Sequence, residues 1–178
     1  MEPITVLTLG TFLERLGQEY GRPATLYLLG GSALSLLGSP RSTLDIDYDV
    51  ELPQTELIVL QGAINALAAE MHLDVEFVPL AEFAPLPPSA HERRRFIGRY
   101  GQLDVYIFDL YSIALSKISR GFESDLEDVL YLLKAGLIEF RELKRYFGIV
   151  LPLAPKTDVN PREFQAYFDE IERRLELR

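Results

Sequence analysis

The strongest constraint on the fold is an eight-residue segment, residues 44–51 (LDIDYDVE), in which apolar and acidic residues alternate. A period of two is typical of a β-strand, whose successive side chains point to opposite faces of a sheet. Asp45, Asp47 and Asp49 would therefore share one face, within about 14 Å of one another. Like charges at this spacing repel each other, so this face is either fully solvated or neutralised by a cation.

Two interpretations fit this acidic strand. Carboxylates at positions i and i+2 suit Mg²⁺ or Mn²⁺, which take oxygen ligands and often share them with the phosphates of a substrate. The alternative is an exposed edge strand that its acidic residues keep from pairing with other chains. The residues before the strand bear on this choice.

A Gly-Gly-Ser turn precedes the acidic strand. Residues 24–29 (ATLYLL) predict a buried strand that leads into Gly30 and Gly31, and Ser32 is expected to begin a short helix. Glycines at such a turn let the backbone approach a phosphate, and a helix N-terminus offers N–H groups to an anion. Ser32 would either hydrogen-bond a phosphate oxygen or cap the helix. The separation of 13 positions between Ser32 and Asp45 leaves enough chain for the helix and its return to the next strand.

The remaining pattern predicts an α+β fold, with a mixed sheet and helices first and a helical C-terminal part last. Strands are expected at residues 24–29, 44–51, 73–78, 94–99 and 103–108, and helices at 5–19, 32–37, 54–71, 109–119, 124–135, 138–147 and 161–176. We expect one domain over residues 1–178, with a core at about 24–135 and a helical part at about 136–178.

Composition limits the partners and the location of the chain. It has 178 residues, a net charge of −9 and no cysteine, so disulfides and thiolate metal sites are excluded. A general nucleic-acid binder needs clustered basic residues; the candidate cluster here, residues 93–95, is either such a patch or a solvated strand edge. Neither an apolar run of membrane-spanning length nor a secretory signal occurs, so we expect a cytoplasmic location and no membrane partner.

The combined motif resembles a known signature. An apolar strand, Gly-Gly-Ser, a short helix and apolar-Asp-apolar-Asp, as in residues 30–50 (GGSALSLLGSPRSTLDIDYDV), is similar to the signature of the polymerase-β-like nucleotidyltransferase superfamily. The segment looks closest to its minimal branch, which includes the nucleotidyltransferase-like toxins of AbiE-type toxin–antitoxin systems. Arg41 and Thr43 match the Arg and the Ser or Thr that usually precede the first Asp in that branch. The resemblance extends over about residues 24–135.

This resemblance implies a Mg²⁺- or Mn²⁺-dependent nucleotidyltransferase, which moves a nucleoside monophosphate from an NTP to a hydroxyl group of an RNA, a protein or a small molecule. Asp45 and Asp47 would bind the metal with a third carboxylate, for which Glu76 is preferred over Asp74. The nucleotide would be bound by Gly30, Gly31, Ser32, Arg41 and Thr43. The alternative is a catalytically inactive module of the same fold that binds a nucleotide or a partner, and a cognate protein partner or a homodimer is compatible with either function.

A second segment, residues 109–134 (DLYSIALSKISRGFESDLEDVLYLLK), resembles the second signature of the same branch. Lys117 follows apolar residues on a predicted helix, and such a lysine either extends to water or meets an anion. Asp125 is expected to open the next helix, with Asp128 on the same face. The resemblance implies that Lys117 and Asp125 border the nucleotide and that Asp128 supports them. The alternative is an ion pair between Lys117 and Asp125 or Asp128.

Overall fold

The computed structural model describes residues 2–176 of the chain. It divides into two compact units, of which unit 1 comprises Met1–Pro79 and Arg95–Phe108, and unit 2 comprises Leu80–Arg94 and Asp109–Arg178. The single domain expected from the sequence stays a prediction. Within residues 2–176 no helix is both long enough and apolar enough to cross a membrane.

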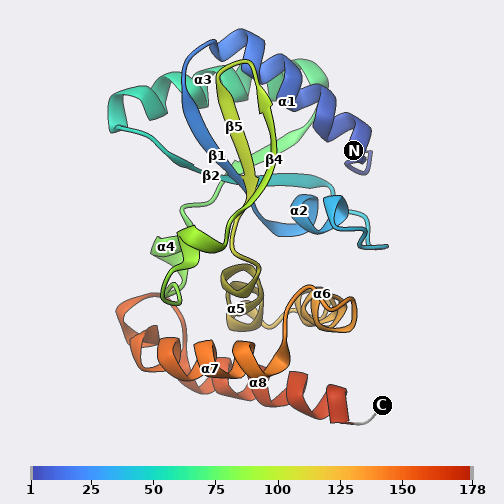
Figure 1. The fold of residues 1–178 in the computed structure, drawn as a ribbon, viewed down its shortest axis with the longest axis vertical. Helices are drawn as coiled ribbons and strands as arrows, with labels where there is room; N and C mark the ends of the chain where they lie inside the picture. The colour runs from blue at the N-terminus through green and yellow to red at the C-terminus, as the bar shows by residue number, and fades with distance from the viewer. Residues whose placement is uncertain (1, 177–178) are drawn as a thin grey trace. The chain divides into compact units, whose positions relative to one another are not determined.

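Unit 1 is built on a mixed sheet of five strands in the order β3-β2-β1-β5-β4 (Figure 1). Its strands are β1 (Ala24–Leu28), β2 (Asp45–Glu51), β3 (Asp74–Phe77), β4 (Arg95–Tyr100) and β5 (Leu103–Ile107), and its helices are α1 (Val6–Tyr20), α2 (Gly30–Leu36) and α3 (Gln54–Met71). β1 is antiparallel to β2 and parallel to β5, β2 is parallel to β3, and β4 is antiparallel to β5.

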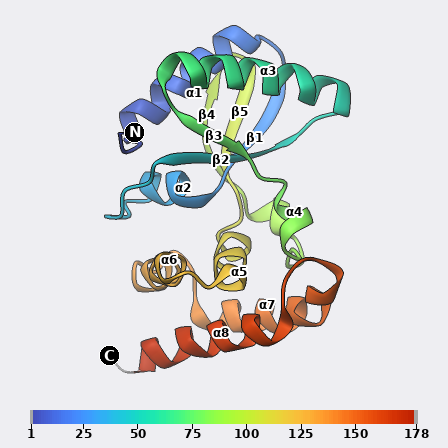
Figure 2. The same ribbon diagram turned by 180° about the vertical axis from the view of Figure 1, so that it is seen from behind.

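Helices α1 and α3 lie side by side in unit 1 (Figures 1 and 2). Tyr48 of β2 points to the sheet face that α3 covers, where its side chain hydrogen-bonds to Gln61. Burial raises the pKa of Tyr48 to about 12, although the bond with Gln61 acts in the opposite direction. Because side chains alternate along a strand, Asp45 and Asp47 point to the other face of the sheet. The fold therefore separates the apolar face of β2 from its acidic face, as the alternation predicted.

Unit 2 consists of helices around an aromatic core. Its elements are α4 (Leu80–Phe83), the 3-10 helix η1 (Ala90–Arg93), α5 (Leu110–Arg120), α6 (Glu123–Lys134), α7 (Phe140–Val150), the 3-10 helix η2 (Leu151–Lys156) and α8 (Pro161–Glu176). The ring of Phe147 in α7 stacks on Phe168 of α8 at 4.0 Å and meets Phe164 edge-on at 4.8 Å. The apolar stripe of the last helix thus packs into the core of unit 2.

The predicted α+β class, with a mixed sheet followed by the helical region α5–α8, is confirmed. Three local expectations were wrong. Helix α2 begins at Gly30 rather than Ser32, because the carbonyl of Leu29 already accepts the first helical hydrogen bond, from Ala33. Asp125 lies in the first turn of α6 but does not open the helix, which begins at Glu123. The proline-rich residues 79–88, which lie outside every strand and helix expected from the sequence, contain the short helix α4.

Candidate metal and nucleotide site

The register of β2 and β3 places four carboxylates on one face of unit 1. Asp45 is paired with Asp74, and Asp47 is paired with Glu76. Paired residues on neighbouring strands lie roughly 5 Å apart and point to the same side of the sheet. Both candidates for the third carboxylate therefore share the face of Asp45 and Asp47. The two aspartates on β2 are half-buried, whereas Asp74 and Glu76 are exposed.

The turn between β1 and α2 fits closely around Asp47. Gly30 has a φ of +58°, in the left-handed region that disfavours residues with a Cβ. A Cβ at this position would also overlap the Asp47 carboxylate. Position 30 therefore needs glycine for two reasons, the positive φ and the close approach of the Asp47 carboxylate. As a result, the backbone of the turn lies directly against this side chain.

A second close approach orients Asp45. The hydroxyl of Thr43 donates a hydrogen bond to Asp45 Oδ1 at 2.7 Å, and Thr43 is 6% exposed. A Cβ at Gly31 would lie 2.7 Å from Thr43 Oγ1, so a glycine is needed there to leave the hydroxyl in place. The Gly30-Gly31 turn therefore supports both aspartates, Asp47 by direct contact and Asp45 through Thr43.

Two further residues of the predicted nucleotide site lie near this turn in the sequence. Ser32 is fully buried, and its hydroxyl donates to the carbonyl of Leu29 at 3.2 Å, which links the start of α2 to the end of β1. This bond is neither of the two roles expected for Ser32. Arg41 lies between α2 and β2, and its backbone N–H donates to Ser39 Oγ at 3.3 Å. Phosphate binding by Ser32 and Arg41 stays a prediction.

The acidic face suits a divalent cation. Hard ions such as Mg²⁺ are typically held by one or two carboxylates and complete their coordination with substrate phosphates and water. Asp45 and Asp47 supply two carboxylates whose positions the turn restricts. Among residues 2–176 there is no group of three or more His, Cys, Asp or Glu side chains that could hold a metal ion. A third protein ligand, at Glu76 or Asp74, therefore stays a prediction.

Comparison with known families bears on the chemistry of this face. Residues 6–175 match the model of a family described as "Nucleotidyltransferase of unknown function (DUF6036)". The chain belongs to this nucleotidyltransferase family. The resemblance to nucleotidyltransferases is thereby confirmed, whereas the assignment to the AbiE-type toxin branch stays a prediction. No match to the chain was found among the curated proteins or the solved structures.

The segment that resembles the second signature lies in unit 2 and forms a buried cluster of charges. Lys117 Nζ donates to Asp125 Oδ1 at 3.1 Å and to Asp128 Oδ2 at 2.7 Å, and all three side chains are at most 4% exposed. Arg120 donates to the same oxygen of Asp125 at 2.6 Å. The structure thus contains the ion pair that was the alternative to nucleotide binding. A nucleotide-binding role for Lys117, Asp125 and Asp128 stays a prediction.

One oxygen of this cluster is unsatisfied. Asp125 Oδ2 is buried and has no hydrogen-bond partner among the described residues. A buried carboxylate oxygen without a donor is destabilising, so the position favours a water molecule or another donor next to Asp125. This unsatisfied oxygen was not predictable from the sequence, because it depends on how α5 and α6 pack.

The basic cluster at residues 93–95 contains a structural arginine. The guanidinium of Arg93 makes two hydrogen bonds of 2.8 Å to the Asp109 carboxylate and lies 4.5 Å from the ring centre of Tyr146. These bonds raise the pKa of Arg93, and Asp109 in turn caps α5 by accepting from the backbone N–H of Ser112. Arg93 therefore has a structural role, and the two alternatives for the cluster as a whole stay predictions. An aspartate directly before a helix was a signal that could have identified Asp109.

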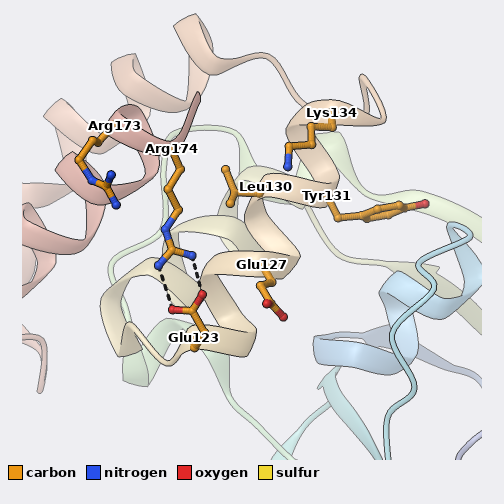
Figure 3. Close-up of a pocket in the computed structure, with 7 residues that line it drawn as sticks. All are labelled: Glu123, Glu127, Leu130, Tyr131, Lys134, Arg173 and Arg174. Atoms are coloured by element: carbon orange, nitrogen blue, oxygen red, sulfur yellow. Dashed lines mark hydrogen bonds and ion pairs between the residues drawn. The ribbon is translucent and has the colours of Figure 1, made fainter. Parts of the chain in front are cut away.

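The sequence also did not reveal an open groove of about 580 Å³ between α6 and α8 of unit 2 (Figure 3). Its lining combines an apolar floor with charges of both signs and comprises Glu123, Glu127, Leu130, Tyr131, Lys134, Arg173 and Arg174. Figure 3 shows Arg174 reaching from α8 to Glu123 of α6, with two bonds of 2.6 and 2.9 Å. Arg173 and Arg174 also bind Glu170, so the groove brings no net positive charge to attract a phosphate.

Proposed function

We propose that the chain is a Mg²⁺- or Mn²⁺-dependent nucleotidyltransferase, which moves a nucleoside monophosphate from an NTP to a hydroxyl group of an acceptor. The observation that carries this proposal is the fit of the Gly30-Gly31 turn to the two aspartates of β2. Gly30 leaves room for the Asp47 carboxylate, and Gly31 leaves room for the Thr43 hydroxyl that orients Asp45. A turn that served only to connect β1 to α2 would not require both contacts.

The residues present fit a divalent ion. Asp45 and Asp47 would hold it, and Glu76 or Asp74 is in register to contribute on the neighbouring strand. The bound ion would neutralise charge on the triphosphate and help to align the reacting oxygens. Without an ion, the like charges on β2 and β3 repel one another and would also repel a triphosphate. A bound cation would lower this repulsion and favour binding of the triphosphate.

Different residues of the chain would act on the acceptor hydroxyl and on the departing phosphates. The acceptor oxygen attacks the α-phosphorus, the bond from this phosphorus to the bridging oxygen breaks, and pyrophosphate leaves. Glu76 or Asp74 would accept the proton of the acceptor hydroxyl, which is general-base catalysis. The backbone at Gly30 and Gly31 would approach the departing phosphates, a contact that the lack of side chains permits.

The proposal is tested with each of the four NTPs labelled at the α-phosphate. The protein is incubated with Mg²⁺ and separated RNA, protein and small-molecule fractions of a cell extract. We expect label in one fraction, none with the double variant Asp45→Asn/Asp47→Asn, and retained transfer with Asp49→Asn, which removes a charge from the same strand. Label transfer that the double variant retains would contradict the proposal. Mg²⁺-dependent NTP binding without transfer to any fraction would instead identify an inactive nucleotide-binding module.

The toxin–antitoxin context implied by the resemblance belongs to the same proposal. It predicts that expression of the chain slows bacterial growth and that a cognate protein relieves the effect. The slowing would require the same carboxylates as transfer. Cells that express the double variant Asp45→Asn/Asp47→Asn should therefore grow as fast as cells that carry an empty vector. Equal slowing by the wild type and the double variant would contradict the toxin context without affecting the proposed transfer activity.

A further inference from the structure

Helix α3 has an exposed face without charge. No charged residue occurs from 57 to 69, although the chain as a whole has a net charge of −9. One side of the helix is buried and contributes Leu60, Ile64 and Leu67 to the core. The opposite side carries two large exposed residues, Ile58 at 63% and Val59 at 43% exposure. A helix that is apolar on all sides is usually buried on all sides.

The exposed residues of α3 between positions 55 and 69 form one continuous face. At 100° per residue they fall within about a third of the helix circumference. They are Thr55, Ile58, Val59, Gly62, Asn65, Ala66 and Ala69, all exposed in the structure. The large residues lie in the N-terminal half of this face, and the small ones lie at its centre and in its C-terminal half. A Cβ at Gly62 would meet no other atom within 4 Å, so the centre of the face is open.

We propose that this face of α3 is the interface of a homodimer, in which two copies of α3 pack antiparallel about a two-fold axis near Gly62. The antiparallel arrangement brings Ile58 of one copy over Ala66 of the other, which pairs large side chains with small ones. Small residues at the crossing point let the two helices approach closely. A two-fold axis makes every such contact twice, as in most homodimers.

Charges at the two ends of α3 complement each other in this arrangement. At the N-terminal end Glu56 pairs with Arg22 at 3.0 Å, and at the C-terminal end Glu70 pairs with Arg15 at 2.9 Å. The more exposed members of these pairs are Arg22, whose side chain is 53% exposed, and Glu70, at 63%. Antiparallel packing brings the Arg22 end of one copy to the Glu70 end of the other. A parallel pair would instead bring like ends together.

The second copy is the occupant that these features favour. An uncharged face lets two chains of net charge −9 meet without repulsion at the point of contact, and its large and small halves match their own reversed copy. An 18-residue helix is about 27 Å long, so the helix pair forms a small interface. We therefore expect a dissociation constant on the order of 10 µM, typical of weak dimers.

Sedimentation velocity over a range of concentrations tests the dimer. We expect the wild type to shift from monomer to dimer, and Ile58→Glu to weaken association at least tenfold. Leu7→Glu is the matched control, because Leu7 is an exposed apolar residue of α1 at 80% exposure and lies outside the proposed interface; it should associate like the wild type. A wild type that stays monomeric at concentrations of roughly 0.5 mM, or an Ile58→Glu variant that dimerises normally, would overturn the proposal.

The orientation is tested by cross-linking, which the absence of native cysteine makes unambiguous. Thr55→Cys and Ala69→Cys variants are oxidised separately and as a mixture. Antiparallel packing about Gly62 places residue 55 opposite residue 69, so the mixture should give a disulfide-linked dimer and the separate variants should not. Cross-linking of each variant to itself, with none added in the mixture, would overturn the antiparallel arrangement.

Discussion

The two units of the chain handle clustered carboxylates in opposite ways. In unit 1, Asp45 and Asp47 lie beside Asp74 and Glu76, on two neighbouring strands. In unit 2 the buried carboxylates of Asp125 and Asp128 are held by Lys117, with Arg120 on the first of them. The buried carboxylates of unit 2 are thus paired with lysine and arginine side chains, whereas those of unit 1 are arranged in a way that suits a divalent cation.

This difference separates a structural cluster from a candidate site. A buried ion pair stabilises a fold chiefly because removing one partner leaves the other charge unpaired in a medium of low polarity. A half-exposed row of like charges contributes no stability of this kind. Solvent screens such charges and so weakens their mutual repulsion. Glycine at positions 30 and 31 costs conformational entropy, and the close approach to Asp47 and Thr43 is what requires it there. The function is therefore expected to depend on unit 1 first.

The largest effect is expected from Lys117→Met, which removes the cation of unit 2. It leaves Asp125 and Asp128 buried without the ammonium group, and loss of one partner from such a cluster costs about 3–5 kcal/mol. Urea denaturation measures the free energy of unfolding. The matched control is Lys144→Met, which breaks the pair with Glu172 on a side chain that is 57% exposed and should cost at most about 1 kcal/mol. Equal losses in the two variants would show that the buried cluster is not a special source of stability.

Gly30→Ala should have the next largest effect. The new methyl group meets the Asp47 carboxylate and the backbone must keep a φ of +58°, which together cost about 1–3 kcal/mol. Metal-dependent stabilisation should fall as well, because Asp47 has to move. Gly10→Ala in the interior of α1 is the control: no atom lies within 4 Å of its Cβ, so it should stabilise the protein by about 0.5–1 kcal/mol. Thermal unfolding with and without Mg²⁺ compares the stability of the two variants. A Gly30→Ala variant with wild-type stability and wild-type stabilisation by Mg²⁺ would contradict the proposed fit of the turn.

Thr43→Val tests the acidic face of unit 1 by removing the hydroxyl that bonds to Asp45. The variant loses the 2.7 Å hydrogen bond to Asp45, and a bond to a charged group contributes about 1.5–3 kcal/mol, less where solvent competes. Thr43→Ser keeps the hydroxyl and should restore metal binding measured by calorimetry. If Thr43→Ser binds Mg²⁺ as weakly as Thr43→Val does, the hydroxyl is not what orients Asp45.

The smallest effect concerns the opposite face of β2. The pKa of Tyr48 is raised by burial, so its stabilising contribution is complete below pH 10 and is lost as the pH rises toward 12. At pH 11 the wild type should have lost about 1 kcal/mol of unfolding free energy through this group. Tyr48→Phe has no proton to lose, so its stability should fall less between pH 9 and pH 11. Parallel pH profiles of the two proteins would contradict the burial of this hydroxyl against α3.

The sequence predicted the elements whose pattern is strictly local. The alternation of β2 and the helical period of α3 each led to bounds within one residue of those observed. Features set by contacts between distant residues were not predictable in this way. The preference for Glu76 over Asp74 stays a prediction, because both lie on the acidic face and each is in register with a different aspartate. The left-handed conformation of Gly30 and the burial of Lys117 likewise depend on neighbours from other elements.

The central claim is that Asp45 and Asp47 together bind a divalent cation with a nucleotide. Isothermal titration of Mn²⁺ in the presence of each NTP tests it most directly, on the wild type, Asp45→Asn/Asp47→Asn and Asp49→Asn. We expect saturable binding by the wild type with at least one NTP, a loss of at least 30-fold in affinity in the double variant, and near wild-type affinity in Asp49→Asn. Equal Mn²⁺ affinity in the wild type and the double variant, or no binding by the wild type with any NTP, would contradict the claim.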